Sequence, residues 1–382
     1  MTRAAWFLGA EVHTALGRGL EATRQALRAA PPAPALAEVP LGAEVEKVPS
    51  LLLAGLPLGD TENRLWNAIE PVVEAAIAAS GLTADQLGRA ALMLGTSSLD
   101  ISVSEAVYAR DLKAGLETHP LLVNASMGAV GERLRRRFGL RGPDYTINTA
   151  CTSSANALIY ADAMIRDGII DHAVIVGLEI FNVITALGFQ SLGLLSSRGM
   201  RPFDPDRSGL VLGEACAAMV VGSAPGPSGF RLKGGANLCD THGVSAANPD
   251  GSTVEAVMRQ ALEAAGVAPA SVLAAKAHGT ASLLNDEAES AGVLRLFDSP
   301  PPLTALKPFI GHTFGACGLA ELILFCTSAE AGFVPGVPGV AAEPSELGLT
   351  LIQQPMPVGR GDFLLNYFGF GGNNTSLVVS NG

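Results

Sequence analysis

One cysteine lies where a thiol can act as a nucleophile. In residues 144–158 (DYTINTACTSSANAL) a short run of strand-forming residues ends in a turn of small residues, and a helical pattern begins directly afterwards. Cys151 stands at that junction, where the positive end of the helix dipole favours the thiolate and makes the sulfur reactive near neutral pH. Because free cysteines are among the most frequently buried residues, this segment alone leaves a structural role open.

Two of the six histidines occupy matching positions between a strand and a helix. His278 ends an apolar strand pattern in the sequence Ala-His-Gly-Thr, where the glycine permits a sharp turn and a close approach of the backbone to a ligand. His312 lies in residues 307–318 (KPFIGHTFGACG), a turn of small residues that leads into a helix. Each could be a hydrogen-bonded structural histidine, but two at matching junctions favour a shared site.

A glycine-rich stretch near the C-terminus offers a different kind of group. Residues 366–374 (NYFGFGGNN) place Phe370 among glycines, and an aromatic side chain on so pliable a backbone suits a gate over a pocket. The backbone N–H groups there also suit the binding of an oxyanion. The alternative is an ordinary glycine-rich turn between two strands.

The elements that must position these groups follow a repeated order. Strand, helix, strand ending in Gly-Thr, helix, strand, small-residue turn, helix and two strands occur on each side of the Pro/Gly linker 224–229. We therefore predict a duplicated α/β protein, with the nucleophile cysteine in an N-terminal half (1–225) and both histidines in a C-terminal half (226–382). Residues 31–57, rich in Pro, Ala and Leu and without clear periodicity, are expected to form a loop or cap region.

The expected strands are nearly continuous apolar runs, which predicts that they are buried on both faces. Functional groups in such folds gather at the carboxyl ends of strands. Cys151, His278 and His312 all lie at expected strand ends, so we expect them to meet in one crevice between the halves.

Composition excludes several classes of protein. With 382 residues, 48% hydrophobic and 16% charged, the chain can bury a large core, yet no apolar run approaches the 18 residues of a membrane span. The first apolar run is broken by Glu11, too early for a signal peptide, which predicts a cytoplasmic protein. Five cysteines without a CxxC pair predict neither a zinc site nor a disulfide framework. A net charge of −11 argues against nucleic acid as a partner.

Several motifs, taken in chain order, resemble those of the β-ketoacyl-acyl-carrier-protein synthases, the elongating condensing enzymes of fatty acid and polyketide synthesis. The similar segments are 149–154 (TACTSS), 201–207 (RPFDPDR) with 211–214 (VLGE), 277–280 (AHGT) with Asp286 and Glu289, 307–318, and 369–372 (GFGG). The resemblance extends from about residue 85 to the C-terminus. It implies a thiolase-like fold with two βαβαβαββ halves in a layered α-β-α-β-α arrangement.

The resemblance also implies roles for individual residues. Cys151 would be the acyl-accepting nucleophile, and His278 and His312 would donate hydrogen bonds to the malonyl thioester oxygen as carbon dioxide leaves. The backbone N–H groups of Cys151 and Phe370 would form the oxyanion hole, and Phe370 would also be a gate. Further residues would support these: Lys307 balanced by Glu321, the acidic Asp286 and Glu289, and Thr280 and Ser282 on the phosphopantetheine arm. No metal and no resident organic cofactor is implied, because phosphopantetheine arrives on the acyl carrier protein.

Four residues depart from the family pattern. Lys276 stands where an Asn is usual, Ser282-Leu283 where Thr-Pro is usual, and Asn373 where a Thr follows the paired glycines. None of these changes removes a catalytic group. Together they favour a divergent synthase of a polyketide-like or aryl-polyene pathway over a housekeeping enzyme.

Other members of the superfamily are alternatives. A non-catalytic subunit of the chain-length-factor kind would typically lack the nucleophile that Cys151 provides. A degradative thiolase would place a second cysteine in the final glycine-rich turn, where this chain has GFGG, and an initiating synthase would replace one histidine by asparagine.

The resemblance implies an acyl carrier protein as partner, and a homodimer, with a heterodimer with a sister ketosynthase-like subunit as the alternative. Because carrier proteins are acidic, the docking surface of this acidic chain must be locally basic. Candidates for it are Arg64, Arg198 and the run 133–137, a run that could instead be a solvated helix end.

Overall fold

A single mixed sheet runs through the computed structural model, which describes residues 3–41, 44–59, 61–99, 101–116, 128–244, 247–337, 339–341 and 346–382. Across the sheet the strands are, in order, β12 (Leu303–Thr304), β11 (Val272–Lys276), β15 (Asp362–Gly369), β16 (Asn373–Ser380), β10 (Arg231–Cys239), β1 (Trp6–Thr14), β9 (Ala215–Gly222), β7 (His172–Glu179), β5 (Ala91–Gly95) and β6 (Asp144–Ile147). A short strand, β2 (Gly17–Arg18), pairs with β1.

The sheet consists of two halves with the same topology. In each half the third strand in sequence pairs in parallel with the second, and the second with the fourth. The fifth strand then runs antiparallel to both the fourth and the first. The halves join where β1 and β10 pair antiparallel at Trp6 and Arg231. The duplicated order expected from the sequence is therefore confirmed in the strand connections.

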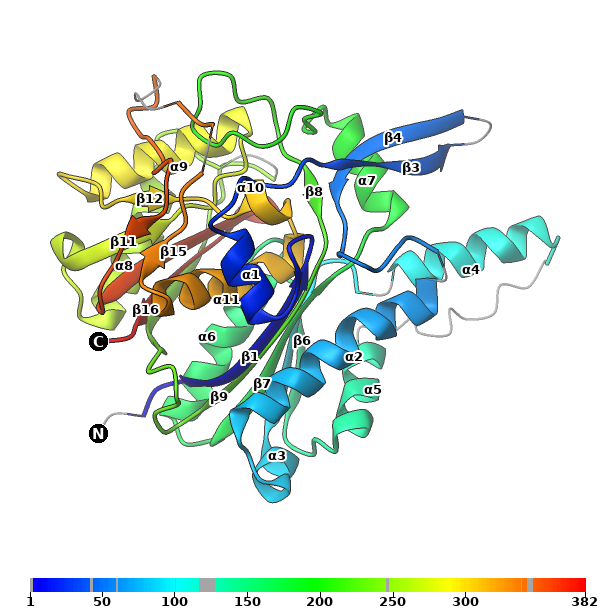
Figure 1. Cartoon of the computed structure of the whole chain (residues 1–382), viewed down its shortest axis with the longest axis horizontal. Helices are drawn as coiled ribbons and strands as arrows, with labels where there is room; N and C mark the ends of the chain where they lie inside the picture. Colours follow the sequence, from blue (N-terminus) through cyan, green and yellow to red (C-terminus); the bar gives the residue numbers. More distant parts are fainter. Residues whose placement is uncertain are drawn as a thin grey trace.

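Helices form layers on both sides of the sheet (Figure 1). Helices α6 (Ser153–Arg166) and α11 (Cys317–Glu330) contact each other and follow the equivalent strands β6 and β12. On the outer faces, α2 (Thr61–Ser80) packs on β1 and β9, and α8 (Ser252–Ala265) packs on β10 and β16. Helix α9 (Leu283–Leu296) packs on α8. This is the layered helix and sheet arrangement of the thiolase fold.

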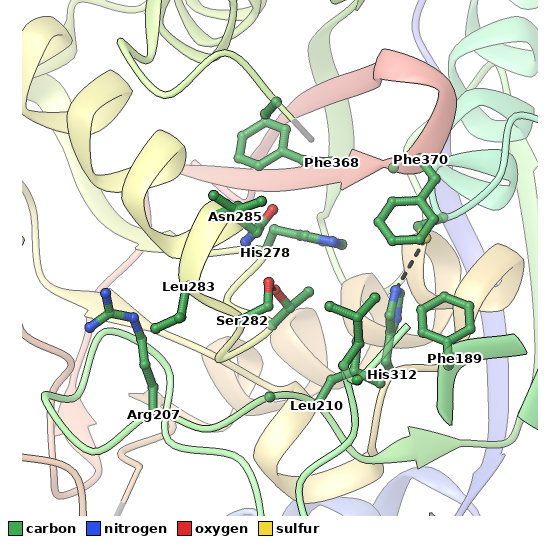
Figure 2. A pocket seen from close by; sticks show the side chains of 18 of the residues that line it. Phe189, Arg207, Leu210, His278, Ser282, Leu283, Asn285, His312, Phe368 and Phe370 are labelled. Carbon is green, nitrogen blue, oxygen red and sulfur yellow. Dashed lines mark hydrogen bonds between the residues drawn. The ribbon is translucent and has the colours of Figure 1, made fainter. Parts of the chain in front are cut away.

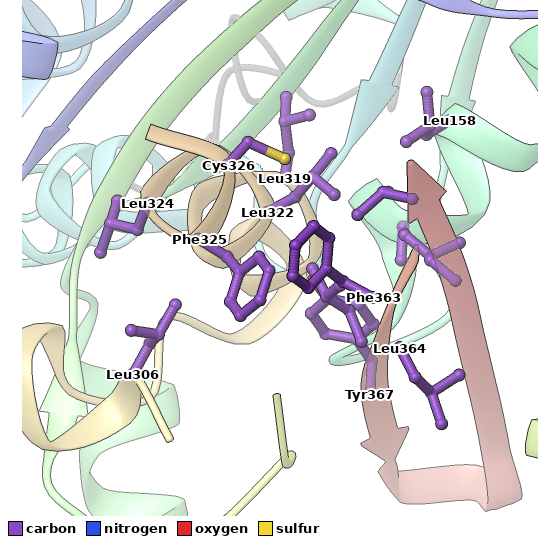
Figure 3. Close-up of a cluster of buried hydrophobic side chains, with 14 of the residues drawn as sticks. Leu158, Leu306, Leu319, Leu322, Leu324, Phe325, Cys326, Phe363, Leu364 and Tyr367 are labelled. Atoms are coloured by element: carbon purple, nitrogen blue, oxygen red, sulfur yellow. The ribbon is translucent and has the colours of Figure 1, made fainter. Parts of the chain in front are cut away.

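The two central helices approach each other closely at their N-termini. A Cβ atom on Gly318 of α11 would lie 2.3 Å from the backbone nitrogen of Ala155 in α6, so only glycine fits there. Further along α11, Leu322 and Phe325 point toward Phe363 of β15 (Figure 3), and the rings of Phe325 and Phe363 meet edge to face with centroids 5.3 Å apart. This packing brings the start of α6, after Cys151, next to the start of α11, after His312.

The prediction of an irregular loop or cap region over residues 31–57 is wrong for residues 35–41 and 44–51. The structure has a hairpin there, of β3 (Ala35–Leu41) and β4 (Glu44–Leu51), which projects from the main body in Figure 1. Val39 and Val48 are buried on one face, whereas Leu36 is exposed, which is the alternation of a half-buried strand. Prolines within these strands hid that period, and an edge strand such as β3 tolerates them because its free N–H side needs no partner.

Shorter elements complete the described chain: α1 (Leu20–Ala26), α3 (Ala84–Arg89), α4 (Ile101–Lys113), α5 (Ala129–Phe138), α7 (Val183–Ser191), β8 (Leu212–Gly213), α10 (Lys307–Ile310), β13 (Phe333–Val334) and β14 (Met356–Pro357). Among the helices in the described ranges, none has the length and apolar character needed to span a bilayer.

Candidate active site

Cys151 sits in a tight turn that the sequence builds from small polar residues. Ala150 has a positive φ of 52°, and the Ser153 hydroxyl closes the turn by accepting from the Thr149 N–H (3.0 Å) and donating to the Ala150 carbonyl. Opposite the turn, a Cβ atom on Gly369 would lie only 3.1 Å from the Cys151 nitrogen. The glycine therefore lets the turn before Phe370 lie against the nucleophile.

The nucleophile and one histidine are in direct contact. Cys151 Sγ lies 3.1 Å from His312 Nε2 (dashed line in Figure 2), and the backbone N–H of Phe314 donates to His312 Nδ1. Because Nδ1 accepts a hydrogen bond, we assign the neutral ring with its proton on Nε2. His312 therefore points an N–H donor at the sulfur, and the backbone N–H of Phe370 points at it as well.

His278 is held in the equivalent tautomer by a buried cation. The Lys307 ammonium, which has no acceptor lone pair, donates to His278 Nδ1 at 3.1 Å, so the ring proton lies on Nε2. The two histidine rings are perpendicular, with centroids 5.5 Å apart. Both rings line the same cavity as Cys151 (Figure 2), so that cavity has two histidine N–H donors, of which the one on His312 contacts the sulfur.

Burial sets the protonation states. It lowers the pKa of both His278 and His312 well below 6.5, with the Lys307 charge acting in the same direction, so both rings are neutral at pH 7. Burial also raises the pKa of the Cys151 thiol to about 11, outweighing the Lys307 charge and the Phe370 N–H. The expectation of a thiolate near neutral pH is therefore contradicted for the resting site, because desolvation exceeds the favourable field.

Behind the histidines lies a buried charge cluster. Glu321 of α11 binds Lys307 through Oε1 (2.7 Å) and Lys276 through Oε2 (2.5 Å), and all three side chains are fully buried. Although burial alone would lower it, the pKa of Lys307 is raised because Glu321 is adjacent. The predicted pairing of Lys307 with Glu321 is present, and the second lysine was not foreseen.

Asp286 and Glu289 act on the backbone. The Glu289 carboxylate accepts from the N–H groups of His278 (2.7 Å) and Gly279 (2.9 Å), which fixes the turn that carries the histidine. Asp286 accepts from the N–H of Phe203 in the 201–207 segment. Both lie on α9, in the place after the Gly-Thr turn where the repeated order of elements predicts a helix.

The cavity has a volume of about 340 Å³ and is largely apolar. Phe370 stacks on Phe189 of α7, with ring centroids 5.5 Å apart (Figure 2), so the side chain predicted to act as a gate packs against an aromatic partner at the cavity. The hydroxyls of Thr280 and Ser282 lie 2.9 Å apart on the cavity wall, where they offer hydrogen-bond donors and acceptors to the cavity. In the described part of the chain no cluster of three His, Cys, Asp or Glu side chains could hold a metal ion.

Comparisons with known proteins agree with this geometry. Residues 67–225 match the family model of the β-ketoacyl synthase N-terminal domain, and residues 230–340 match that of the C-terminal domain. The chain belongs to the β-ketoacyl synthase family.

One curated relative is the chloroplastic 3-oxoacyl-[acyl-carrier-protein] synthase I of Hordeum vulgare, which is 30% identical over 77% of this chain and 68% of its own length. Among solved structures, a ketosynthase in complex with its chain length factor from Xenorhabdus doucetiae is 26% identical, with a TM-score of 0.83 over 99% of this chain and 98% of that chain. A type II polyketide acyl carrier protein complex with its ketosynthase shares the fold at 21% identity, with a TM-score of 0.87 over all of both chains. The synthase is thus a condensing enzyme of the acyltransferase class.

Sequence reasoning missed one carboxylate beside the site. Glu179, at the end of β7, accepts from the backbone N–H groups of Ser97, Ser98 and Gly315, at 3.0, 3.1 and 3.0 Å. It therefore ties the end of β5 to the turn after His312. Its position as the last residue of an apolar strand was the available signal, and the motifs that carried the resemblance do not include it.

One docking candidate of the synthase is wrong. Arg64 is buried, with 5% of its side chain exposed, and forms a bidentate ion pair with Glu214 at 2.6 Å. In the basic run 133–137, Arg133, Arg136 and Arg137 are exposed. Two of them already have partners: Arg133 stacks over Trp66, and Arg133 and Arg137 both face Glu70. Arg198 is exposed. Its backbone N–H donates to the Ser196 hydroxyl, which is hydrogen-bonded to the hydroxyl of Ser208 on the cavity wall.

Proposed function

We propose that this synthase takes an acyl group from an acyl carrier protein onto Cys151 and extends it with malonyl-carrier protein. The single observation that carries the proposal is the arrangement at Cys151 Sγ, which lies 3.1 Å from His312 Nε2 and faces the Phe370 N–H, with the neutral His278 ring beside His312 in the same cavity. Phosphopantetheine arrives on each carrier, so the scheme needs no resident cofactor.

In the first half-reaction the Cys151 sulfur attacks the thioester carbonyl. The N–H groups of Cys151 and Phe370 bind the resulting oxyanion, a contribution commonly worth about 3 kcal/mol per donor. Collapse breaks the bond to the pantetheine sulfur, which leaves with the proton that Cys151 gave up. Because the resting thiol is protonated, this coupled proton transfer is required.

Acylation changes what His312 can do. In the resting enzyme its Nε2–H is directed at Sγ, and an acylated sulfur is a poorer acceptor, so that N–H becomes free. The N–H groups of His278 and His312 then bind the carbonyl oxygen of the malonyl thioester. The bond to the carboxylate breaks, carbon dioxide leaves, and the electron pair forms an enolate. Its carbon attacks the acyl carbonyl and expels the Cys151 thiolate, which takes up a proton from water.

We place the synthase in a specialised polyketide-like or aryl-polyene pathway and expect it to act as a homodimer or with a sister subunit. The departures at Lys276, Leu283 and Asn373 support this, as does the similar ketosynthase that was solved with its chain length factor. The intact nucleophile and histidines argue against a non-catalytic subunit.

The proposal is tested by intact-mass spectrometry of the wild type with a panel of acyl-carrier proteins, followed by malonyl-carrier protein. We expect a mass gain equal to one acyl group, which is released as a product two carbons longer when the malonyl donor is added. A protein that no acyl donor modifies would contradict the proposal and favour the partner-subunit role.

Carrier docking gives a separate prediction. Charge reversal by Arg198→Glu is expected to raise the KM for carrier-borne acyl groups several-fold, because an acidic carrier loses an attractive contact, without changing acylation by a small thioester. Arg89→Glu is the matched control, since Arg89 is exposed on α3, away from the cavity wall. Equal effects of both variants, or none, would place the docking surface elsewhere.

A further inference from the structure

Lys276 is an ammonium group with no access to water. It ends β11, is fully buried, and donates to Glu321 Oε2 (2.5 Å) and to the carbonyl of Asn366 (2.7 Å). The face of the Tyr367 ring lies 3.7 Å from its nitrogen. These contacts join β11, α11 and β15, which are the elements on which the active site is built.

The charges around Lys276 do not balance. Glu321 carries one negative charge, and two ammonium groups share it. The other titratable groups that face this cluster are Cys317 of α11, Glu289 of α9, Tyr367 of β15, and the neutral His278 and His312. Burial raises the pKa of the Glu289 carboxyl to about 7, so at pH 7 it offsets only part of the second ammonium charge, and the cluster keeps a partial net positive charge beside the histidines.

A buried cation of this kind is costly, and an apolar side chain of similar length would stabilise the fold better. The usual Asn at this position would also leave a neutral Lys307–Glu321 pair. Stability therefore does not explain why a lysine occupies position 276. The geometry supplies a reason, because the hydrogen-bonded path from Lys276 runs through Glu321 and Lys307 to His278 Nδ1.

We infer that Lys276 is a positioning residue, which anchors Glu321 so that Lys307 holds His278 as the Nε2–H donor, and whose charge favours the enolate and the Cys151 thiolate. This inference rests on the proposed function of His278. Each anionic state formed in the cavity is stabilised by the extra positive charge, so the effect belongs to the chemical steps and not to substrate binding.

The pKa of Lys276 supports this assignment. Burial, together with repulsion from Lys307, lowers it to about 8, against the attraction of Glu321. The charge is therefore present at pH 7 and lost as the pH rises through about 8. A group whose folded pKa lies below its unfolded value opposes folding while it is charged, so the protonated lysine lowers stability at pH 7.

The experiment measures malonyl-carrier-protein decarboxylation from pH 6 to 10 for the wild type and Lys276→Met. We expect the wild-type kcat to fall as the pH passes about 8. The variant should have a kcat about tenfold lower than the wild type at pH 7 and an unchanged KM. Its kcat should not fall as the pH passes about 8. Its melting temperature at pH 7 should be equal or higher. In a Cys239→Ala background, which removes the exposed thiol, the pH midpoint of Cys151 alkylation by iodoacetamide should rise.

Lys276→Gln is a second variant, which keeps a hydrogen-bond donor but removes the charge. Lys233→Met is the control, because it breaks the half-buried Lys233–Asp362 ion pair, which lies outside the site. The inference is overturned if Lys276→Met keeps the wild-type rate and pH profile, if activity and melting temperature fall together with an unchanged profile, or if neither variant folds. A wild type that neither decarboxylates malonyl-carrier protein nor accepts an acyl group would instead overturn the proposed function, and this inference with it.

Discussion

Replacing Cys151 by alanine is expected to abolish acylation and to lower condensation by at least about 10⁴-fold. The Cys151 sulfur lines the cavity as a nucleophile that can hold the acyl chain, with His312 Nε2 at 3.1 Å and the Phe370 N–H aimed at it. Decarboxylation of malonyl-carrier protein should continue, because the variant frees the His312 N–H from its resting acceptor. The measurement pairs intact mass after acyl transfer with carbon dioxide release.

The control is Cys239→Ala, which removes the exposed cysteine among those that the structure describes. It should keep both acylation and condensation, whereas Cys151→Ala keeps neither. A mass gain that persists in Cys151→Ala but disappears in Cys239→Ala would place the acyl group on the surface thiol and contradict the assignment of the nucleophile.

The sequence predicted the parts of the site that lie at strand ends. Cys151, His278 and His312 follow β6, β11 and β12, so the topology alone brings them together once the halves pair. The duplication was visible because strand-ending Gly and small-residue turns recur in each half, and glycine is required where backbones touch, as at Gly318. A local sequence pattern was therefore sufficient to predict a feature wherever the fold requires a specific small residue.

Other features depend on long-range burial, which a local pattern does not encode. Lys276 stood out as a departure from the family, but nothing nearby in sequence indicates that it shares Glu321, 45 residues away, with Lys307. Arg64 was taken for a surface cation because its partner, Glu214, is 150 residues away. The pKa of Cys151 was misjudged for the same reason, since burial outweighs the local helix field.

Removing the charge of Glu321 is expected to destabilise the fold strongly. Glu321→Gln leaves Lys276 and Lys307 buried without a counterion, and the loss of one partner from a buried ion pair typically costs about 3–5 kcal/mol of unfolding free energy. Urea denaturation at pH 7 measures it. Asp362→Asn is the matched control, because the partly exposed Lys233–Asp362 pair should contribute about 1 kcal/mol or less.

The pH dependence of the unfolding free energy distinguishes a loss of charge pairing from a loss of packing. In Glu321→Gln the pKa of a buried lysine falls further, so the folded protein releases a proton at a lower pH than the unfolded chain, whose lysines titrate near about 10.4. Between those two pH values the unfolded variant binds more protons than the folded variant, so the unfolding free energy of the variant increases with pH. The difference in unfolding free energy between Glu321→Gln and the wild type should therefore shrink as the pH rises from 7 toward 10. Adding Lys276→Met should recover part of the deficit at pH 7, because one unpaired cation is removed. A deficit that neither pH nor the second substitution changes would assign the loss to packing around Glu321 and would contradict a shared charge cluster.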